Sequence, residues 1–125
     1  METKMKTFLK AALLSFILAA PATAHEQGIG PNGGMRVDAA PYRIELVPAG
    51  TAVNIYIIME DDSAIDTSTM KGTAILLIDG KPVRVVLVPK EPGVLSAETG
   101  ITVPDGVKGV VQIIGADGKT VQAKY

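Results

Sequence analysis

Metal-ligating chemistry in this chain begins with one residue, His25. It is the only histidine of the 125 residues, and the chain has no cysteine. His25 follows the small-residue run ATA at 22–24, so cleavage after that run gives it a free α-amine beside its imidazole. These two nitrogens can chelate one Cu(II) ion at neutral pH. We therefore take His25 as a candidate metal ligand, with Met35 or Asp38 completing the shell. The alternative is an exposed histidine at a frayed end.

The first 24 residues predict a cleaved, helical secretory signal. Lys4, Lys6 and Lys10 give a positive start, and the apolar run AALLSFILAA at 11–20 is too short for a stable membrane span. The run at 22–24 supplies small residues at the −3 and −1 positions of the cut. We expect the mature protein to begin at His25, to be periplasmic and to have no membrane anchor.

Two other groups of side chains have ligand chemistry. Met35, Met59 and Met70 remain after cleavage, and their thioethers are soft ligands for Cu(I), although methionine more often fills gaps in a core. The acidic run EDDSAIDTST at 60–69 offers carboxylates to a hard cation, but it lacks the central glycine and late glutamate of a helix-loop-helix calcium site. We expect a solvated connection between strands there, with a cation site as the alternative.

The sequence gives little support to an enzyme. Nucleophilic catalysis needs a Ser, Cys or Thr activated by an oriented base, and the one histidine lies at the predicted mature terminus. The stretch GIGPNGG at 28–34 has no predicted strand before it and no helix after it, so a phosphate-binding loop is not supported. We expect a non-catalytic protein without an organic cofactor, and a turn at 28–34 leading into the first strand.

The charge balance argues against nucleic acid and membrane partners. Removing the first 24 residues takes away three of the 12 basic and one of the 13 acidic side chains, which leaves nine basic and twelve acidic. This acidic balance gives no basic footprint for nucleic acid. No cationic amphipathic stretch indicates a membrane surface. Ligand candidates are therefore a metal ion or an envelope protein, and the oligomeric state is left open.

The fold class follows from the pattern of apolar residues. Both phenylalanines leave with the signal, so the core must consist mainly of Val, Ile, Leu and Ala, a composition that favours sheets. The run YRIELV at 42–47 alternates, with Tyr42, Ile44 and Leu46 on one face and Arg43 and Glu45 on the other. It predicts a half-buried strand, which pairs with a second strand at 51–59.

Two more hairpins are predicted further along the chain. Asp79-Gly80 lies between β-rich runs at 72–78 and 82–88, as in a type I′ turn, and Asp117-Gly118 lies between runs at 107–114 and 120–125. One short strand is expected near 94–97. We therefore predict an all-β fold, an antiparallel sandwich or small open barrel of about seven short strands. Its parts are the signal at 1–24, a flexible segment at 25–34 and a β-sandwich domain at 35–125.

Three stretches of the mature chain resemble a group of small exported bacterial proteins. They are HEQGIGPNGGMRVDAAPYRIELV at 25–47, GTAILLIDGKPVRVVLVP at 72–89 and ADGKTVQAKY at 116–125. Similar stretches occur in periplasmic segments of heavy-metal efflux adaptor proteins. The resemblance implies a β-rich periplasmic accessory to metal handling. This chain has Asn32 where some relatives have histidine, and Glu60-Asp61-Asp62 where an Asp-His pair can follow the second strand, so two potential ligands are absent.

Three functions from different classes follow. The first is a periplasmic, non-catalytic metal-handling accessory protein that binds or delivers copper or a similar soft or borderline metal through His25, with Met35 or Asp38. The second is a metal-free interaction domain that docks on another cell-envelope protein through its sheet edges and the segment at 28–34. The third is a hydrolase using carboxylates of the acidic run. The sequence places the first slightly above the second.

Overall fold

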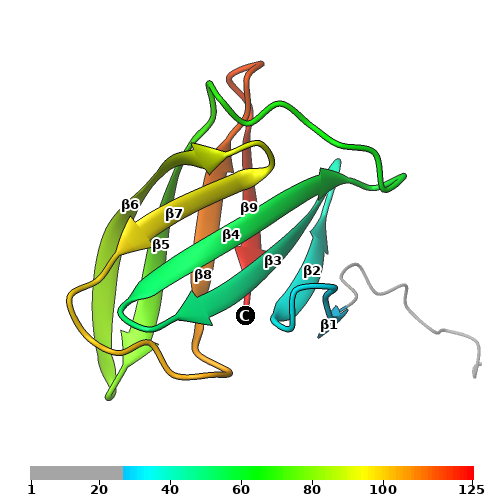
Figure 1. Cartoon of the computed structure of the whole chain (residues 1–125). Coiled ribbons are helices and arrows are strands. Elements are labelled where there is room, and N and C mark those ends of the chain that lie inside the picture. The colour runs from blue at the N-terminus through cyan, green and yellow to red at the C-terminus, as the bar shows by residue number, and fades with distance from the viewer. Residues whose placement is uncertain (1–26) are drawn as a thin grey trace, which may run out of the picture.

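Strands dominate the part of the chain that the structure describes. The computed structural model describes residues 27–125, which contain nine strands and no helix (Figure 1). In chain order the strands are β1 (Gln27–Ile29), β2 (Met35–Ala39), β3 (Tyr42–Ala49), β4 (Ala52–Met59), β5 (Lys71–Ile78), β6 (Lys81–Glu91), β7 (Val94–Glu98), β8 (Lys108–Ile114) and β9 (Thr120–Lys124). The all-β prediction is therefore confirmed. The predicted signal and His25 lie outside the described residues.

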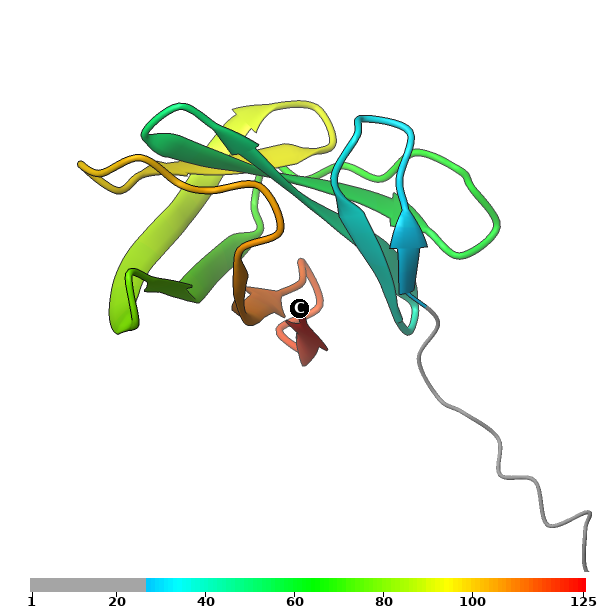
Figure 2. The same cartoon turned by 90° about the horizontal axis from the view of Figure 1, so that it is seen from below.

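The nine strands form one curled antiparallel sheet. Their order across it is β1-β2-β3-β4-β7-β6-β5-β8-β9. β6 joins the two halves, because its first residues pair with β5 and its last residues pair with β7. The register shifts between Pro89 and Glu91, an irregularity of the kind that bends a strand. Figure 2 shows the resulting half-barrel, in which β3, β4 and β7 lie across the core from β5, β8 and β9.

The predicted hairpins are present, and two strands were not foreseen. Asp79 and Gly80 have φ of 55° and 76°, as a type I′ turn requires. The last hairpin differs, because only Gly118 has a positive φ there, while the Asp117 carboxylate accepts a hydrogen bond of 2.9 Å from the Lys119 amide. The two additional strands are β1 and β2. They went unpredicted because β1 has three residues and β2 lacks a continuous β-branched run.

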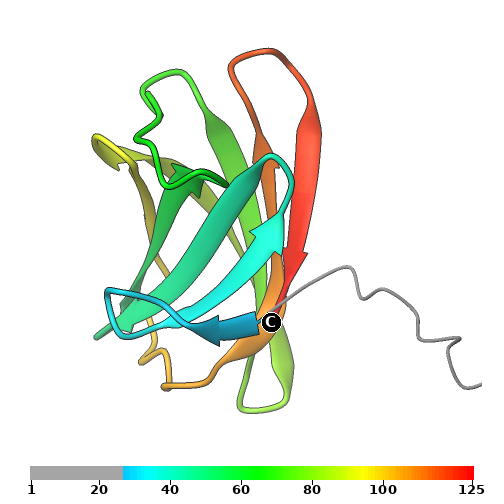
Figure 3. The same ribbon diagram turned by 90° about the vertical axis from the view of Figure 1, so that its right-hand side faces the viewer.

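The core lies on the concave side of the curled sheet. Alternate side chains point inward from each strand, as the period of two requires. The inward residues of β4 and β5 illustrate the pattern, since all are buried: Val53, Ile55, Ile57, Ala74, Leu76 and Ile78. The two edges of the sheet approach each other at the open side, where the Gln27 side-chain amide donates to the Lys124 carbonyl at 3.0 Å. Figure 3 shows the C-terminus beside β1 at this seam.

Candidate functional site

The structure does not bring the described metal-ligand candidates together. Met35 and Asp38 are both on β2 but three positions apart, so their side chains point to opposite faces of the sheet. Met35 lines an apolar hollow with Leu46, Pro48 and Val107, where it fills space. His25 lies outside the described residues. Met35 and Asp38 therefore cannot serve one ion together.

Asp38 lies in a small polar hollow on the outer face of β2. Gln27, Arg36 and Arg43 also line this hollow. The Arg43 Nε atom is 3.5 Å from the Asp38 carboxylate, and Arg43 also reaches Asp62 at 2.9 Å. Two guanidinium groups beside the carboxylate weaken its attraction for a cation. Gln27, which is two positions after His25 in the sequence, lines the same hollow as Asp38. The start of β1 is therefore close to Asp38.

The acidic run at 60–69 uses its carboxylates locally. Asp61 accepts hydrogen bonds from the Ser63 amide at 3.0 Å and hydroxyl at 2.6 Å, and these bonds lower the pKa of Asp61. The Ser68 amide in the same way lowers the pKa of Asp66. Within residues 27–125 no group of three or more histidine or acidic side chains could hold a metal ion. The run is a connection between β4 and β5, stabilised by short turns.

Glu45 is a buried carboxylate whose surroundings the sequence did not reveal. Its alternation on β3 places it on the outer face, as predicted, yet it is only 2% exposed. A turn at 30–34, between β1 and β2, covers it. The carboxylate accepts bonds from the Asn32 amide at 2.9 Å, the Asn32 side chain at 3.0 Å and the Gly34 amide at 2.8 Å. Because these donors compensate the buried charge, Glu45 can fix the turn in place.

The glycines of this turn permit its close approach to β3. A side chain at Gly30 would overlap the Glu45 carboxyl group, and one at Gly34 would overlap the Leu46 carbonyl. Gly33 has a φ of 86°, which other residues rarely adopt. The turn is closed by the Gly30 amide, which donates to the Gly34 carbonyl at 2.8 Å. The predicted turn at 28–34 is thus present, and its glycines serve packing against Glu45.

A second buried polar side chain, Thr67, fixes the turn between β6 and β7. Thr67 is 1% exposed, and its hydroxyl accepts a hydrogen bond of 3.0 Å from the Gly93 amide. The Gly93 carbonyl in turn accepts a 2.9 Å bond from the Ile57 amide of β4. Glu45 and Thr67 are the two buried polar side chains among residues 27–125. Glu45 therefore holds the turn at 30–34 against the outer face of β3, and Thr67 holds the turn at 92–93 beside β4.

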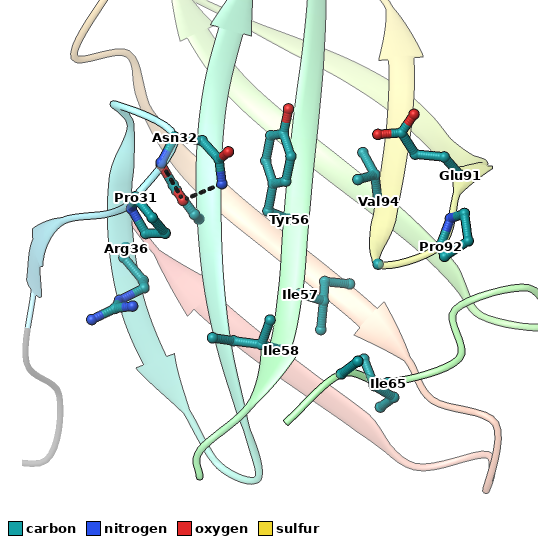
Figure 4. Close-up of a pocket in the computed structure, with 13 residues that line it drawn as sticks. Pro31, Asn32, Arg36, Tyr56, Ile57, Ile58, Ile65, Glu91, Pro92 and Val94 are labelled. Atoms are coloured by element: carbon teal, nitrogen blue, oxygen red, sulfur yellow. Dashed lines mark hydrogen bonds between the residues drawn. The ribbon is translucent and has the colours of Figure 1, made fainter. Parts of the chain in front are cut away.

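The two turns form opposite walls of a groove on this outer face. Pro31 and Asn32 lie on one side, and Pro92 and Gly93 lie on the other. The floor is largely apolar, with the Tyr56 ring between the walls and Ile58, Ile65 and Val94 beside it (Figure 4). The volume is about 280 Å³, close to the lower end for small-ligand sites. The groove is thus large enough for one or two side chains of a partner.

Opposite charges mark the two ends of the groove. Arg36 lies at the side of the Asn32 wall, and Glu91 lies at the side of the Pro92 wall, with Tyr56 between them (Figure 4). Both charged side chains border an apolar floor, where a partner's charges are only partly screened by water. The arrangement therefore has a direction: it complements an acidic group at one end and a basic group at the other.

No family model, no curated protein and no solved structure matches this chain. Among residues 27–125 no helix has the length and apolar character needed to cross a membrane.

Proposed function

We propose that this chain is a non-catalytic interaction domain whose groove binds an extended segment of another cell-envelope protein. The observation that carries the proposal is the pairing of the two buried polar side chains with the two walls. Glu45 and Thr67 are the polar groups that the described fold buries, and both fix turns that border the groove. A groove whose walls are fixed before binding loses little conformational freedom when a ligand enters.

The chemistry of the groove defines the segment that fits it. The apolar floor around Tyr56 and Ile58 takes an aliphatic side chain, which loses its contact with water there. Arg36 pairs with an acidic residue on one side of that anchor, and Glu91 pairs with a basic residue on the other. The expected ligand is therefore a short extended peptide in which an aliphatic side chain lies between an acidic and a basic residue. The acidic residue faces Arg36, and the basic residue faces Glu91.

A phage library of random peptides, selected on the purified domain, tests this proposal. Enriched peptides should contain an aliphatic residue between opposite charges. Their affinity should fall at least about tenfold for Ile58→Asp, because the substitution places a charge on the apolar floor. Ile114→Asp, a matched change at an exposed β8 position, should bind the peptides as the wild type does. Peptides that bind Ile58→Asp as well as the wild type would refute the groove as the binding site.

Metal handling through His25 is the second candidate. It rests on the predicted α-amine and imidazole of a mature terminus at His25, and on the position of Gln27 beside Asp38. Among divalent first-row metals, Cu(II) generally binds such nitrogen ligands most tightly. Asp38 is the companion that this position favours, and Met35 faces the other side of the sheet.

Isothermal titration of the exported protein with Cu(II) tests this second candidate. One equivalent should bind, and His25→Ala or one extra residue before His25 should weaken binding strongly, because the extension moves the free amine away from the imidazole. Asp38→Asn should weaken it further, whereas Met35→Leu should not. Equal copper affinity in all these proteins would show that His25 is not a ligand.

A further inference from the structure

The outer face of the second half of the sheet combines cations with exposed aliphatic side chains. Four strands contribute one basic residue each to this face: Lys71 of β5, Arg84 of β6, Lys108 of β8 and Lys124 of β9. The register places each cation directly across from an aliphatic residue of a neighbouring strand. The pairs are Lys71 with Ile114, Arg84 with Ile75, Lys108 with Leu77, and Lys124 with Val110. We call these eight residues, with Val86 and Val88 of β6, the basic face.

The exposure of the aliphatic residues on this face is unusual for the molecule. Seven large apolar side chains are exposed among residues 27–125, and five of them belong to the basic face. These five are Val86 at 69%, Val88 at 54%, Leu77 at 51%, Ile114 at 42% and Ile75 at 38%. Apolar side chains gathered on one surface in this way indicate a contact with another body.

The charge on this face has one sign. The outward positions of β5, β8, β9 and the part of β6 that pairs with β5 include no aspartate or glutamate, although the chain beyond residue 24 has more acidic than basic residues. The acidic residues nearest in sequence to the four cations lie in the loops and turns between strands: Asp66, Asp79, Asp105 and Asp117. Within the described residues no carboxylate forms an ion pair with any of the four cations. Their charges are therefore available to an anionic surface.

We propose that the basic face binds the anionic surface of a lipid bilayer. Lysine and arginine can extend to lipid phosphates while neighbouring aliphatic side chains enter the headgroup region. A second copy fits this face poorly, because two such faces would bring like charges together. Protein interfaces are typically rich in aromatic residues and poor in lysine, whereas this face has three lysines and no aromatic side chain. The composition therefore favours lipid over a protein partner.

The position of the basic face agrees with a peripheral protein. Figure 2 shows the β5–β8–β9 layer across the core from the β3–β4–β7 layer, so their outer faces point in opposite directions. A bilayer bound to the first layer leaves the groove on the second layer open. The proposal does not depend on what the groove binds.

Cosedimentation of residues 25–125 with vesicles tests the proposal. The full mature segment should sediment with phosphatidylcholine vesicles containing about 30% phosphatidylglycerol, and not with phosphatidylcholine alone, and salt should weaken binding. Lys108→Glu/Lys124→Glu should lower the partition coefficient at least about tenfold. The matched pair Lys90→Glu/Lys119→Glu changes the net charge equally but lies at strand and turn positions outside this face, and it should keep most of the binding.

Two further measurements distinguish a lipid surface from an acidic protein as the partner of the basic face. Leu77→Ser/Val86→Ser should also reduce vesicle binding, and circular dichroism should show that the exposed changes leave the sheet intact. Poly-L-glutamate serves as a probe for an acidic protein partner. The proposal would be overturned in favour of such a partner if the protein bound poly-L-glutamate but not vesicles, and if this binding required the lysines but not Leu77 and Val86. Absence of vesicle binding by the wild type would also overturn the proposal. So would an equal loss of vesicle binding in the two double lysine variants.

Discussion

Glu45 shows how one buried charge determines the shape of a surface. It is an ordinary outward residue of an alternating strand until the turn at 30–34 covers it and supplies three donors. A buried carboxylate without such partners would strongly destabilise the fold. The turn and the carboxylate therefore depend on each other, and the Asn32 wall of the groove depends on both.

Glu45→Gln should destabilise the protein by about 2 kcal/mol, because the amide presents a donor group where two backbone amides already donate. Urea unfolding measures the change. Glu60→Gln, an exposed carboxylate in the acidic run, should stay within about 0.5 kcal/mol of the wild type. If the two variants are equally stable, the Glu45 bonds do not hold the turn.

Tyr125 closes the open side of the half-barrel. Its hydroxyl donates to the Ile44 carbonyl at 2.8 Å, which links the C-terminus to β3. Burial, and secondly the negative charge of Glu45, raise the pKa of Tyr125 above its ordinary value. The folded state therefore favours the neutral phenol. Its stabilisation is complete below the pKa of the unfolded chain, about 10, and is lost as the pH rises above that value.

Tyr125→Phe should lower the stability at neutral pH by about 1 kcal/mol, through loss of one hydrogen bond. Its melting temperature should then fall less than that of the wild type between about pH 9 and pH 11, because the ionising group is absent. Thermal melts across this range provide the measurement. Parallel curves for the two proteins would contradict the assignment of alkaline sensitivity to Tyr125.

Among the elements, the β5–β6 hairpin was predictable because its determinants are local. Asp79-Gly80 specifies its own turn, and both residues have the positive φ that this turn requires. The strands β1 and β2 were not predictable in this way. β2 pairs with β3 and β1 pairs with β2, and the turn between β1 and β2 packs on Glu45, a contact between residues 11 to 13 positions apart that no local pattern reveals.

Gly80→Val should destabilise the domain by about 1–2 kcal/mol, because a β-branched residue resists the φ of 76° at this turn. Gly28→Val provides the matched control, since Gly28 has no positive φ and open space around its Cα. Denaturant unfolding of both variants measures the difference. A Gly80→Val protein as stable as the control would mean that the turn does not need glycine.

At the scale of the whole molecule, the sequence predicted the class of fold but not its surfaces. The period-two runs indicated the inward and outward positions, since these depend on each strand alone. The groove and the basic face depend on strand order. No segment of the sequence is both cationic and amphipathic, because each of four strands supplies one basic residue and pairing assembles them on one side.

The candidate metal ligands also show that the sequence did not predict which side chains share a surface. Met35 and Asp38 are close in sequence, and the sequence offered either of them as a companion ligand to His25. They are three positions apart on a strand, so their side chains point to opposite faces of the sheet. The sequence alone did not predict this separation, because it did not predict that β2 is a strand. The groove, by contrast, is bordered by the turns before β2 and before β7, which are far apart in the sequence.

The most direct test of the interaction function is a nuclear magnetic resonance titration of the isotope-labelled mature protein with an enriched peptide. We predict chemical-shift changes concentrated at Tyr56, Ile58, Ile65 and Val94, with smaller changes at the two fixed turns, and none on the outer face of β5 and β8. Changes centred on β5 and β8, or spread evenly over the sheet, would show that the groove is not the binding site.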